Sequence, residues 1–334
     1  MPAAPASRAE PLMRLPSPRG PLGERVLTVL RGEVREVGDP GAAVIEVPDQ
    51  RACDDDALTL WVLHELHYRG FEDVSEEWEW APALMGVRWL LEHELEERLR
   101  VRYADARVPV ADEVTRSLAT LTATHEGPSL ARHLQRNASR EQALALLRQR
   151  SLYHLKEGDP TSWVIPRLTT RPKAALLEVQ FDEYGDGDPA RLHHEMFARG
   201  LETSGLCSAY GHYVDEALVP VLEQNNAVSM FGLHRRLRGA ALGHLAAFES
   251  TSAVPSRQLA QGLTRLGFPP EMIAYYDEHV EADAVHEQVV VRDVCGALVQ
   301  EEPGQHEEVV FGAWTCLDLE ARTATAMLAR WDAA

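Results

Sequence analysis

Apolar residues recur at spacings of three and four from about Asp54 to the end of the chain, and no long stretch alternates apolar and polar residues. This periodicity is typical of amphipathic helices, and it predicts an all-α protein. We expect helices over residues 54–70, 82–103, 112–124, 128–136, 140–157, 172–184, 188–203, 209–224, 226–250, 256–266, 270–298 and 306–332.

Local signals mark several helix ends independently of the apolar pattern. Ser139 and Gln142 have the spacing of a capping box, and Asp188 places an N-cap residue before a proline. Glycine and proline at Gly205 and at 267–270 indicate helix stops. These signals strengthen the helical interpretation of the second half of the chain.

The helical pattern does not extend to the N-terminus. Residues 1–24 are rich in proline, alanine and arginine and lack an apolar segment, which predicts a disordered tail and not a secretory signal. A few β-branched residues in 24–47 indicate a short strand or hairpin. A domain boundary is plausible near 105–112 or near 126. The second position would divide the remainder into an N-terminal helical subdomain, 25–126, and a C-terminal domain, 127–334.

Composition and charge exclude several classes of protein. With 45% hydrophobic and 25% charged residues the chain is globular, and no apolar run approaches the roughly 18 residues that a membrane span needs. The balance of 33 Lys and Arg against 52 Asp and Glu gives a net charge of −19, which argues against nucleic-acid and anionic-membrane partners. Four cysteines without a CxxC pair indicate no disulfide framework, so we expect a cytoplasmic, reduced protein.

Common nucleotide-binding and hydrolase motifs are absent. The chain has no GxGxxG, GxxxxGK[ST], GxSxG or HExxH, and the run from His64 to His67 resembles the last only superficially.

A candidate metal motif lies in the predicted helix 270–298. At about 100° per residue, positions i, i+4 and i+7 return to within roughly 60° of one another, so His279, Asp283 and His286 share one helix stripe and Glu281 points away. Two imidazoles and a carboxylate form a ligand set that suits iron, manganese or zinc. An acidic helix with two incidental histidines explains the motif equally well when it is considered alone.

Further ionisable residues lie in otherwise apolar helices, where a charge needs a partner. They are Asp182 and Glu183, His193, and Glu249. Each alone has an ordinary explanation as a solvated or core residue. Together with the HxxxDxxH helix they supply carboxylates and imidazoles from separate helices, which is how a helical bundle builds a two-metal centre.

The order and spacing of these residues resemble those of the haem-oxygenase-like diiron oxidases and oxygenases, a family also labelled iron-containing redox enzymes. The resemblance covers about 140–330. It includes a glutamate ending one helix, a second glutamate with a histidine ten residues on, a further glutamate, and the HxxxDxxH helix. The resemblance implies a haem-oxygenase-like helical bundle with an N-terminal helical extension. Its metal ligands would be Glu157, Glu183, His193, Glu249, His279, Asp283 and His286.

The same resemblance implies an activity. The protein would be a non-haem diiron oxygenase or oxidase that uses two ferrous ions, dioxygen as co-substrate and an external reductant to oxidise a small molecule. N-oxygenation of an amine or amino acid is the type of reaction whose ligand spacing is most similar, and oxidation of an activated C–H bond is the other. An external electron donor is required because no CxxxC…H iron–sulphur segment follows the bundle.

Several alternatives stay open. His194 competes with His193, and His154 lies one turn before Glu157, where we expect a neighbour and not a ligand. The arginines of 235–238 would meet a substrate carboxylate or face solvent. A haem-binding or haem-degrading protein on the same fold and a non-enzymatic metal-binding helical protein are the competing functions. A homodimer is compatible with the sequence.

Overall fold

The computed structural model describes residues 12–32, 45–48 and 51–333, and within the last range it leaves the side chains of 281–285 undescribed. In these ranges the chain forms helices and no strands, with one isolated bridge between Met13 and Phe71. The all-α prediction is therefore confirmed. No helix among the described residues combines the length and apolarity needed to cross a bilayer.

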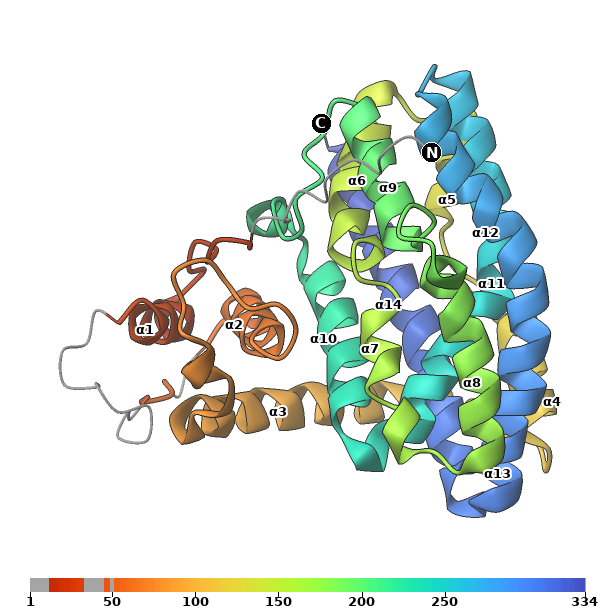
Figure 1. Cartoon of the computed structure of the whole chain (residues 1–334), viewed down its shortest axis with the longest axis horizontal. Helices are drawn as coiled ribbons and strands as arrows, with labels where there is room; N and C mark the ends of the chain where they lie inside the picture. The colour runs from red at the N-terminus through yellow and green to blue at the C-terminus, as the bar shows by residue number, and fades with distance from the viewer. Residues whose placement is uncertain (1–11, 33–44, 49–50, 334) are drawn as a thin grey trace, which may run out of the picture.

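The second half of the chain forms an upright bundle (Figure 1). Helix α11 runs through it and packs against α5, α12 and α14, while α9 packs against α12. The predicted capping box is present, since the Ser139 hydroxyl accepts from the Gln142 backbone and the Gln142 side chain accepts from the Ser139 backbone. The bundle elements are α5 (Leu130–Arg136), α6 (Arg140–His154), α7 (Asp159–Ser162), α8 (Thr170–Glu183), α9 (His193–Thr203), α10 (Val219–Leu233), α11 (Arg238–Arg265), α12 (Pro270–Gln288), α13 (Ala297–Glu301) and α14 (His306–Asp332).

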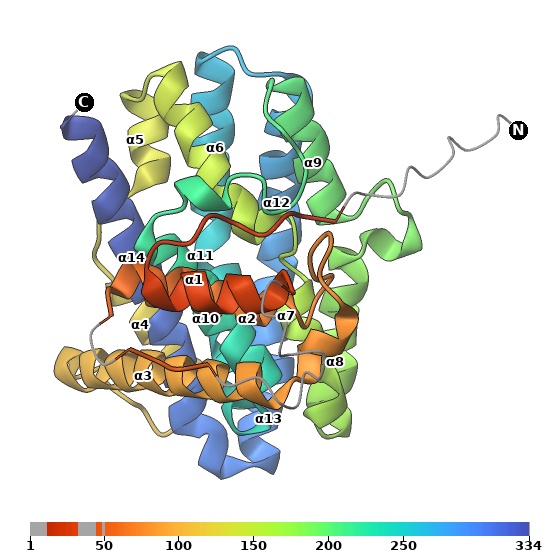
Figure 2. The ribbon, with the colours of Figure 1, turned by 90° about the vertical axis from the view of Figure 1, so that its left-hand side faces the viewer.

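Three N-terminal helices lie across one side of this bundle (Figure 2). They are α1 (Pro21–Leu30), α2 (Cys53–Glu65) and α3 (Pro82–Ala106). The next helix, α4 (Val114–Thr124), packs instead against α11 and α14 of the bundle. Helix α2 packs on α10, and α3 reaches both α10 and α14. The predicted helical extension is therefore present, and the domain boundary near residue 126 stays a prediction.

Two expectations for the N-terminal region are corrected. Residues 12–24 are not a loose tail, because Met13 is buried and α1 begins at Pro21; residues 1–11 lie outside the described part. A strand or hairpin was expected in 24–47; the start of this stretch is helical, since α1 continues to Leu30, and residues 33–44 lie outside the described part. Its first turn is held by Asp55, whose carboxylate accepts hydrogen bonds from backbone N–H groups at the start of α1. This long-range capping bond is not visible in the local sequence.

The helix boundaries around α10 and α11 also differ from the prediction. Helix α10 continues through Asn225 and Asn226, and the interruption falls at His234 instead. Helix α11 is continuous through Pro255, where a break was expected between 250 and 256. A proline inside a helix costs about 3 kcal/mol, and packing of α11 against α12 and α14 offsets this cost.

Two glycines allow α11 and α14 to approach closely. A β-carbon at Gly243 would overlap the backbone carbonyl of Val309, and one at Gly312 would overlap that of Ala240. Reciprocal glycines of this kind let two helix backbones come into direct contact. This contact places α11, which carries Glu249, in the centre of the bundle.

Candidate metal centre

Six of the seven predicted ligands come together in the bundle. They form two groups of three, and within each group one nitrogen or oxygen of every member lies within 4.8 Å of the others. Asp283 lies on α12, but its side chain is outside the described residues. The two groups are Glu157, His193 and His279, and Glu183, Glu249 and His286.

The first group joins residues from three parts of the bundle. Glu157 follows the end of α6, His193 is the first residue of α9, and His279 lies in α12. All three are buried. Glu157 Oε1 lies 3.9 Å from His193 Nδ1 and 3.7 Å from His279 Nε2. These separations leave room for an ion between the donor atoms.

The second group lies beside the first. Glu183 ends α8, Glu249 lies in α11, and His286 lies in α12. His286 Nδ1 is 3.5 Å from Glu249 Oε2 and 3.9 Å from Glu183 Oε1. The other oxygen of Glu183 lies 3.1 Å from His193 Nδ1, in the first group. Glu183 therefore has one carboxylate oxygen toward each group.

Backbone and carboxylate contacts fix the orientation of the two α12 histidines. His279 Nδ1 donates to the backbone carbonyl of Tyr275 at 2.7 Å, which directs Nε2 toward Glu157. His286 Nε2 forms an ion pair with Asp182 at 2.8 Å, which directs Nδ1 toward the second group. Partners of this kind set the tautomer and the ring position of metal-binding histidines. Asp182 was noted in the sequence only as one more ionisable residue, without this role.

A buried hydrogen-bond network surrounds Glu157. The Tyr275 hydroxyl donates to Glu157 Oε2 at 2.9 Å, and His154 Nδ1 lies 2.9 Å from the same oxygen. Burial would raise the pKa of Glu157, but hydrogen bonds from His154 and His279 hold it well below its usual value. His154 is a neighbour that contacts Glu157, and it belongs to neither group.

The electrostatics of both groups favour positive charge. Burial would lower the pKa of His286, but Glu249, Glu183 and Asp182 outweigh burial and raise it to about 9. For His193, burial acts in the same direction and is outweighed mainly by Glu183, so its pKa is also raised. Buried carboxylates that raise the pKa of neighbouring histidines also favour a metal cation at the same position.

The residues present fit iron. His193 Nδ1 and His286 Nδ1 are buried and make no hydrogen bond with the described residues, although carboxylate oxygens face both. An unsatisfied buried nitrogen costs about 1–3 kcal/mol, and coordination to a metal ion removes this cost. Three carboxylates and three imidazoles form the mixed oxygen and nitrogen set used by non-haem iron.

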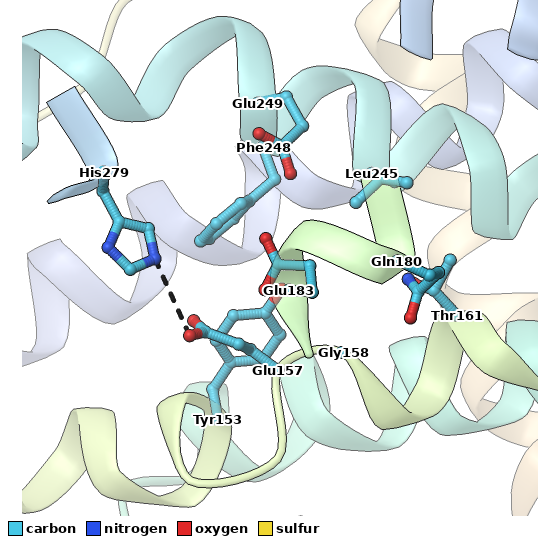
Figure 3. Close-up of a pocket in the computed structure, with 10 residues that line it drawn as sticks. All are labelled: Tyr153, Glu157, Gly158, Thr161, Gln180, Glu183, Leu245, Phe248, Glu249 and His279. Atoms are coloured by element: carbon cyan, nitrogen blue, oxygen red, sulfur yellow. Dashed lines mark ion pairs between the residues drawn. The ribbon is translucent and has the colours of Figure 1, made fainter. Parts of the chain in front are cut away.

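A narrow cavity opens beside the two groups (Figure 3). Glu157, Glu183, Glu249 and His279 face it on one side. Phe248 and Leu245 of α11 supply apolar surface and limit access of water. The remaining lining residues are Tyr153, Gly158, Thr161 and Gln180.

The structure bears on two questions left open by the sequence. His194 is half-buried and belongs to neither group, whereas His193 is buried within the first. The arginines of 235–238 do not line the cavity beside the two groups. Arg236 pairs with Glu96 at 2.8 Å, and Arg238 pairs with Glu302. Contact of these arginines with a substrate carboxylate stays a prediction.

Comparison with known proteins identifies a family and two similar solved structures. The model of a family described as iron-containing redox enzymes matches residues 144–321, a range that contains all seven predicted ligands. Two crystal structures of a CADD-like protein of unknown function from Nostoc punctiforme are similar to the chain. The first, at 2.00 Å resolution, has 18% identity and a TM-score of 0.48, and the match covers 72% of this chain and 98% of that one. The second, at 1.35 Å, has 16% identity and a TM-score of 0.46, covering 72% and 96%. No curated protein matches the chain.

Proposed function

Because the chain belongs to the family of iron-containing redox enzymes, we propose that it is a non-haem diiron oxygenase that uses dioxygen to oxidise a small amine. The reaction would be N-oxygenation. One oxygen atom of dioxygen enters the new N–O bond, and the other leaves as water with two protons and two electrons from an external donor.

The observation that carries this proposal is the pair of adjacent donor groups linked by Glu183. A single iron would need only one of these groups. A haem protein would need one axial histidine and would leave three buried carboxylates without a function. One ion in each group would account for all six described donors.

When bound, a pair of ferrous ions supplies electrons for the reduction of dioxygen. The chain holds this pair through His193 and His279 on one side and His286 on the other. Tyr275 and His154 hold the carboxylate of Glu157 in place by hydrogen bonds. Asp182, on the more exposed side of the centre, lies 2.8 Å from His286 Nε2 and holds that ring in position.

The cavity determines what can reach the centre. Phe248 and Leu245 provide an apolar wall that excludes bulk water, which limits loss of reducing equivalents to solvent. The three carboxylates favour a substrate that arrives as an ammonium ion and releases its proton before oxidation. Amine oxidation fits this combination of apolar walls and acidic oxygens.

Anaerobic loading with Fe(II), followed by metal analysis and absorption spectroscopy, tests the proposal. We expect about two iron ions per chain and no Soret band. A Soret band would identify a haem protein, and no iron binding would leave a non-enzymatic helical protein. The loaded protein should consume oxygen faster with a small amine and a chemical reductant than without the amine.

Adjacent histidines provide a matched control. His193→Ala should reduce bound iron to about one ion or fewer per chain, because it removes a donor from the first group. His194→Ala should leave the iron content unchanged, because that side chain lies outside both groups. Equal iron loss in the two variants would contradict the proposed ligand set.

A further inference from the structure

The short segment that carries Glu157 differs from the rest of the metal centre. The other five described ligands lie in helices, where backbone hydrogen bonds fix their positions. Glu157 instead lies between α6, which ends at His154, and α7, which begins at Asp159. Side-chain contacts of this turn therefore decide how firmly it presents the Glu157 carboxylate to the first group.

Lys156 ties the turn to the N-terminal extension. Its ammonium group forms an ion pair with Glu65, the last residue of α2, and the lysine and glutamate side chains are 5% and 0% exposed. The same nitrogen lies 4.2 Å from the centre of the Tyr68 ring, which is a cation–π contact. The Tyr210 hydroxyl donates to Glu65 Oε1 at 2.8 Å, so the carboxylate that receives the lysine is itself held in place.

The turn is held on both sides of Glu157. Lys156 directly precedes it, with Cα atoms about 3.8 Å apart, so a shift of one residue moves the other. Asp159, two residues after Glu157, accepts a hydrogen bond from the Tyr184 hydroxyl at 2.8 Å. The contact with Glu65 is the more buried of the two. Because a buried ammonium group without its anion is costly, the turn would shift if Glu65 lost its charge.

We propose that Glu65 is a positioning residue for the metal centre, which fixes through Lys156 the turn that presents Glu157 to the first ion. This inference rests on the proposed function, because it assumes that the first group binds iron. It makes α2 a part of the metal site and not only a helix packed on the bundle. The second group is built from α8, α11 and α12, so loss of Glu65 affects the two ions unequally.

Chelator competition with the Fe(II)-loaded full-length protein under anaerobic conditions tests this inference. Glu65→Gln removes the anion that pairs with Lys156. It should weaken iron binding at one of the two sites about 10- to 100-fold, as loss of a partner outside the ligand shell does, and leave the other site unchanged. Mössbauer spectroscopy of the iron-loaded variant should show one altered iron signal beside one natural signal. Equal weakening of both sites would overturn the inference.

A double variant separates positioning from stability. Glu65→Gln leaves a buried ammonium group unpaired and so also destabilises the fold, whereas Glu65→Leu with Lys156→Met replaces the pair by apolar side chains of similar size and should recover stability. The weakened iron site should persist in this double variant. Recovery of natural iron affinity would overturn the inference, because it would show that the ion pair only stabilises the fold.

Glu92→Gln is the matched control, since Glu92 is also buried in the N-terminal extension and paired with a cation, Arg88. It should lose stability and bind both ions as the natural chain does. The same selective loss of one ion in Glu92→Gln and Glu65→Gln would refute the specific role of Glu65. Iron content of the natural chain separates the two proposals, since fewer than two ions refutes the proposed function, whereas two ions held equally well without Glu65 refutes only its positioning role.

Discussion

Two buried clusters of histidine and glutamate lie in this molecule, one at the metal centre and one where α2 and α3 meet α10. We call the second the interface cluster; its members are His64, His67, Arg88, Glu92 and His234. In it, Glu92 Oε1 accepts from His64 at 3.0 Å and Glu92 Oε2 accepts from His234 at 2.7 Å. Both carboxylate oxygens therefore have a protein donor.

The metal centre also contains buried histidines and glutamates, but their hydrogen bonding is incomplete. His193 Nδ1 and His286 Nδ1 face carboxylates and make no hydrogen bond with the described residues. The pKa shifts also differ. Burial lowers the pKa of His64 and His67, whereas carboxylates overcome burial and raise the pKa of His193 and His286. Residue type and burial are shared, and Arg88 Nε in the interface cluster also lacks a hydrogen bond among the described residues, so it is the pairing of the histidine nitrogens that separates the structural network from the metal site.

The comparison of the two clusters predicts its largest effect on the stability of the folded protein. Glu92→Gln should lower the free energy of unfolding by about 3–5 kcal/mol, because it leaves the buried Arg88 guanidinium without its anion. Iron content per folded chain should not change. Urea denaturation of the metal-free protein would measure the first quantity, and metal analysis the second.

Glu97→Gln is the control, since Glu97 is exposed on the same helix. It should change stability by less than about 0.5 kcal/mol. If Glu92→Gln instead reduced iron binding at unchanged stability, the interface cluster would be part of a metal site and the contrast would be wrong.

A smaller effect is expected on metal affinity at the centre. Asp182→Asn should weaken iron binding about 10- to 100-fold, because the amide no longer orients His286 as a charged acceptor does. Stability of the metal-free protein should change little. Competition with a chelator would measure the affinity, and Glu178→Gln, an exposed position on the same helix, should bind iron as the natural chain does. Unchanged affinity in Asp182→Asn would show that His286 needs no such partner.

The sequence predicted the helical bundle and the shared stripe of the α12 histidines because both depend on regular spacing. His279 and His286 lie two turns apart on one helix, and a helix places such residues on one side whatever surrounds it. The structure adds that they serve different groups. Glu157, Glu183 and Glu249 lie far apart in the chain, so only the family resemblance indicated that they meet.

Contacts made across the fold were not predictable. The run from His64 to His67 was set aside as a poor HExxH match, and it instead forms the core of the interface cluster. The roles of Asp182 and Tyr275 depend on which ring nitrogen or carboxylate oxygen each one reaches. The continuity of α11 through Pro255 depends on packing against neighbouring helices. Periodicity contains no information about such partners.

The smallest effect concerns acid stability and His67. Its Nε2 accepts from Arg88, and its Nδ1 donates to Glu79 at 3.2 Å, so the ring is neutral in the folded protein. Burial, together with the charge of Arg88, lowers its pKa to about 4.

In the unfolded chain the pKa of this histidine is about 6.5. Between pH 6.5 and pH 4 the unfolded chain therefore binds a proton that the folded protein does not, and stability falls as the pH is lowered. His67→Gln should remove on the order of 1 kcal/mol of this loss between neutral pH and pH 4.5, measured by urea denaturation of the metal-free protein. His212→Gln, at an exposed ring, should reproduce the natural pH profile. Parallel profiles for the natural chain and His67→Gln would mean that His67 is protonated in the folded protein, and that the interface cluster tolerates positive charge as the metal centre does.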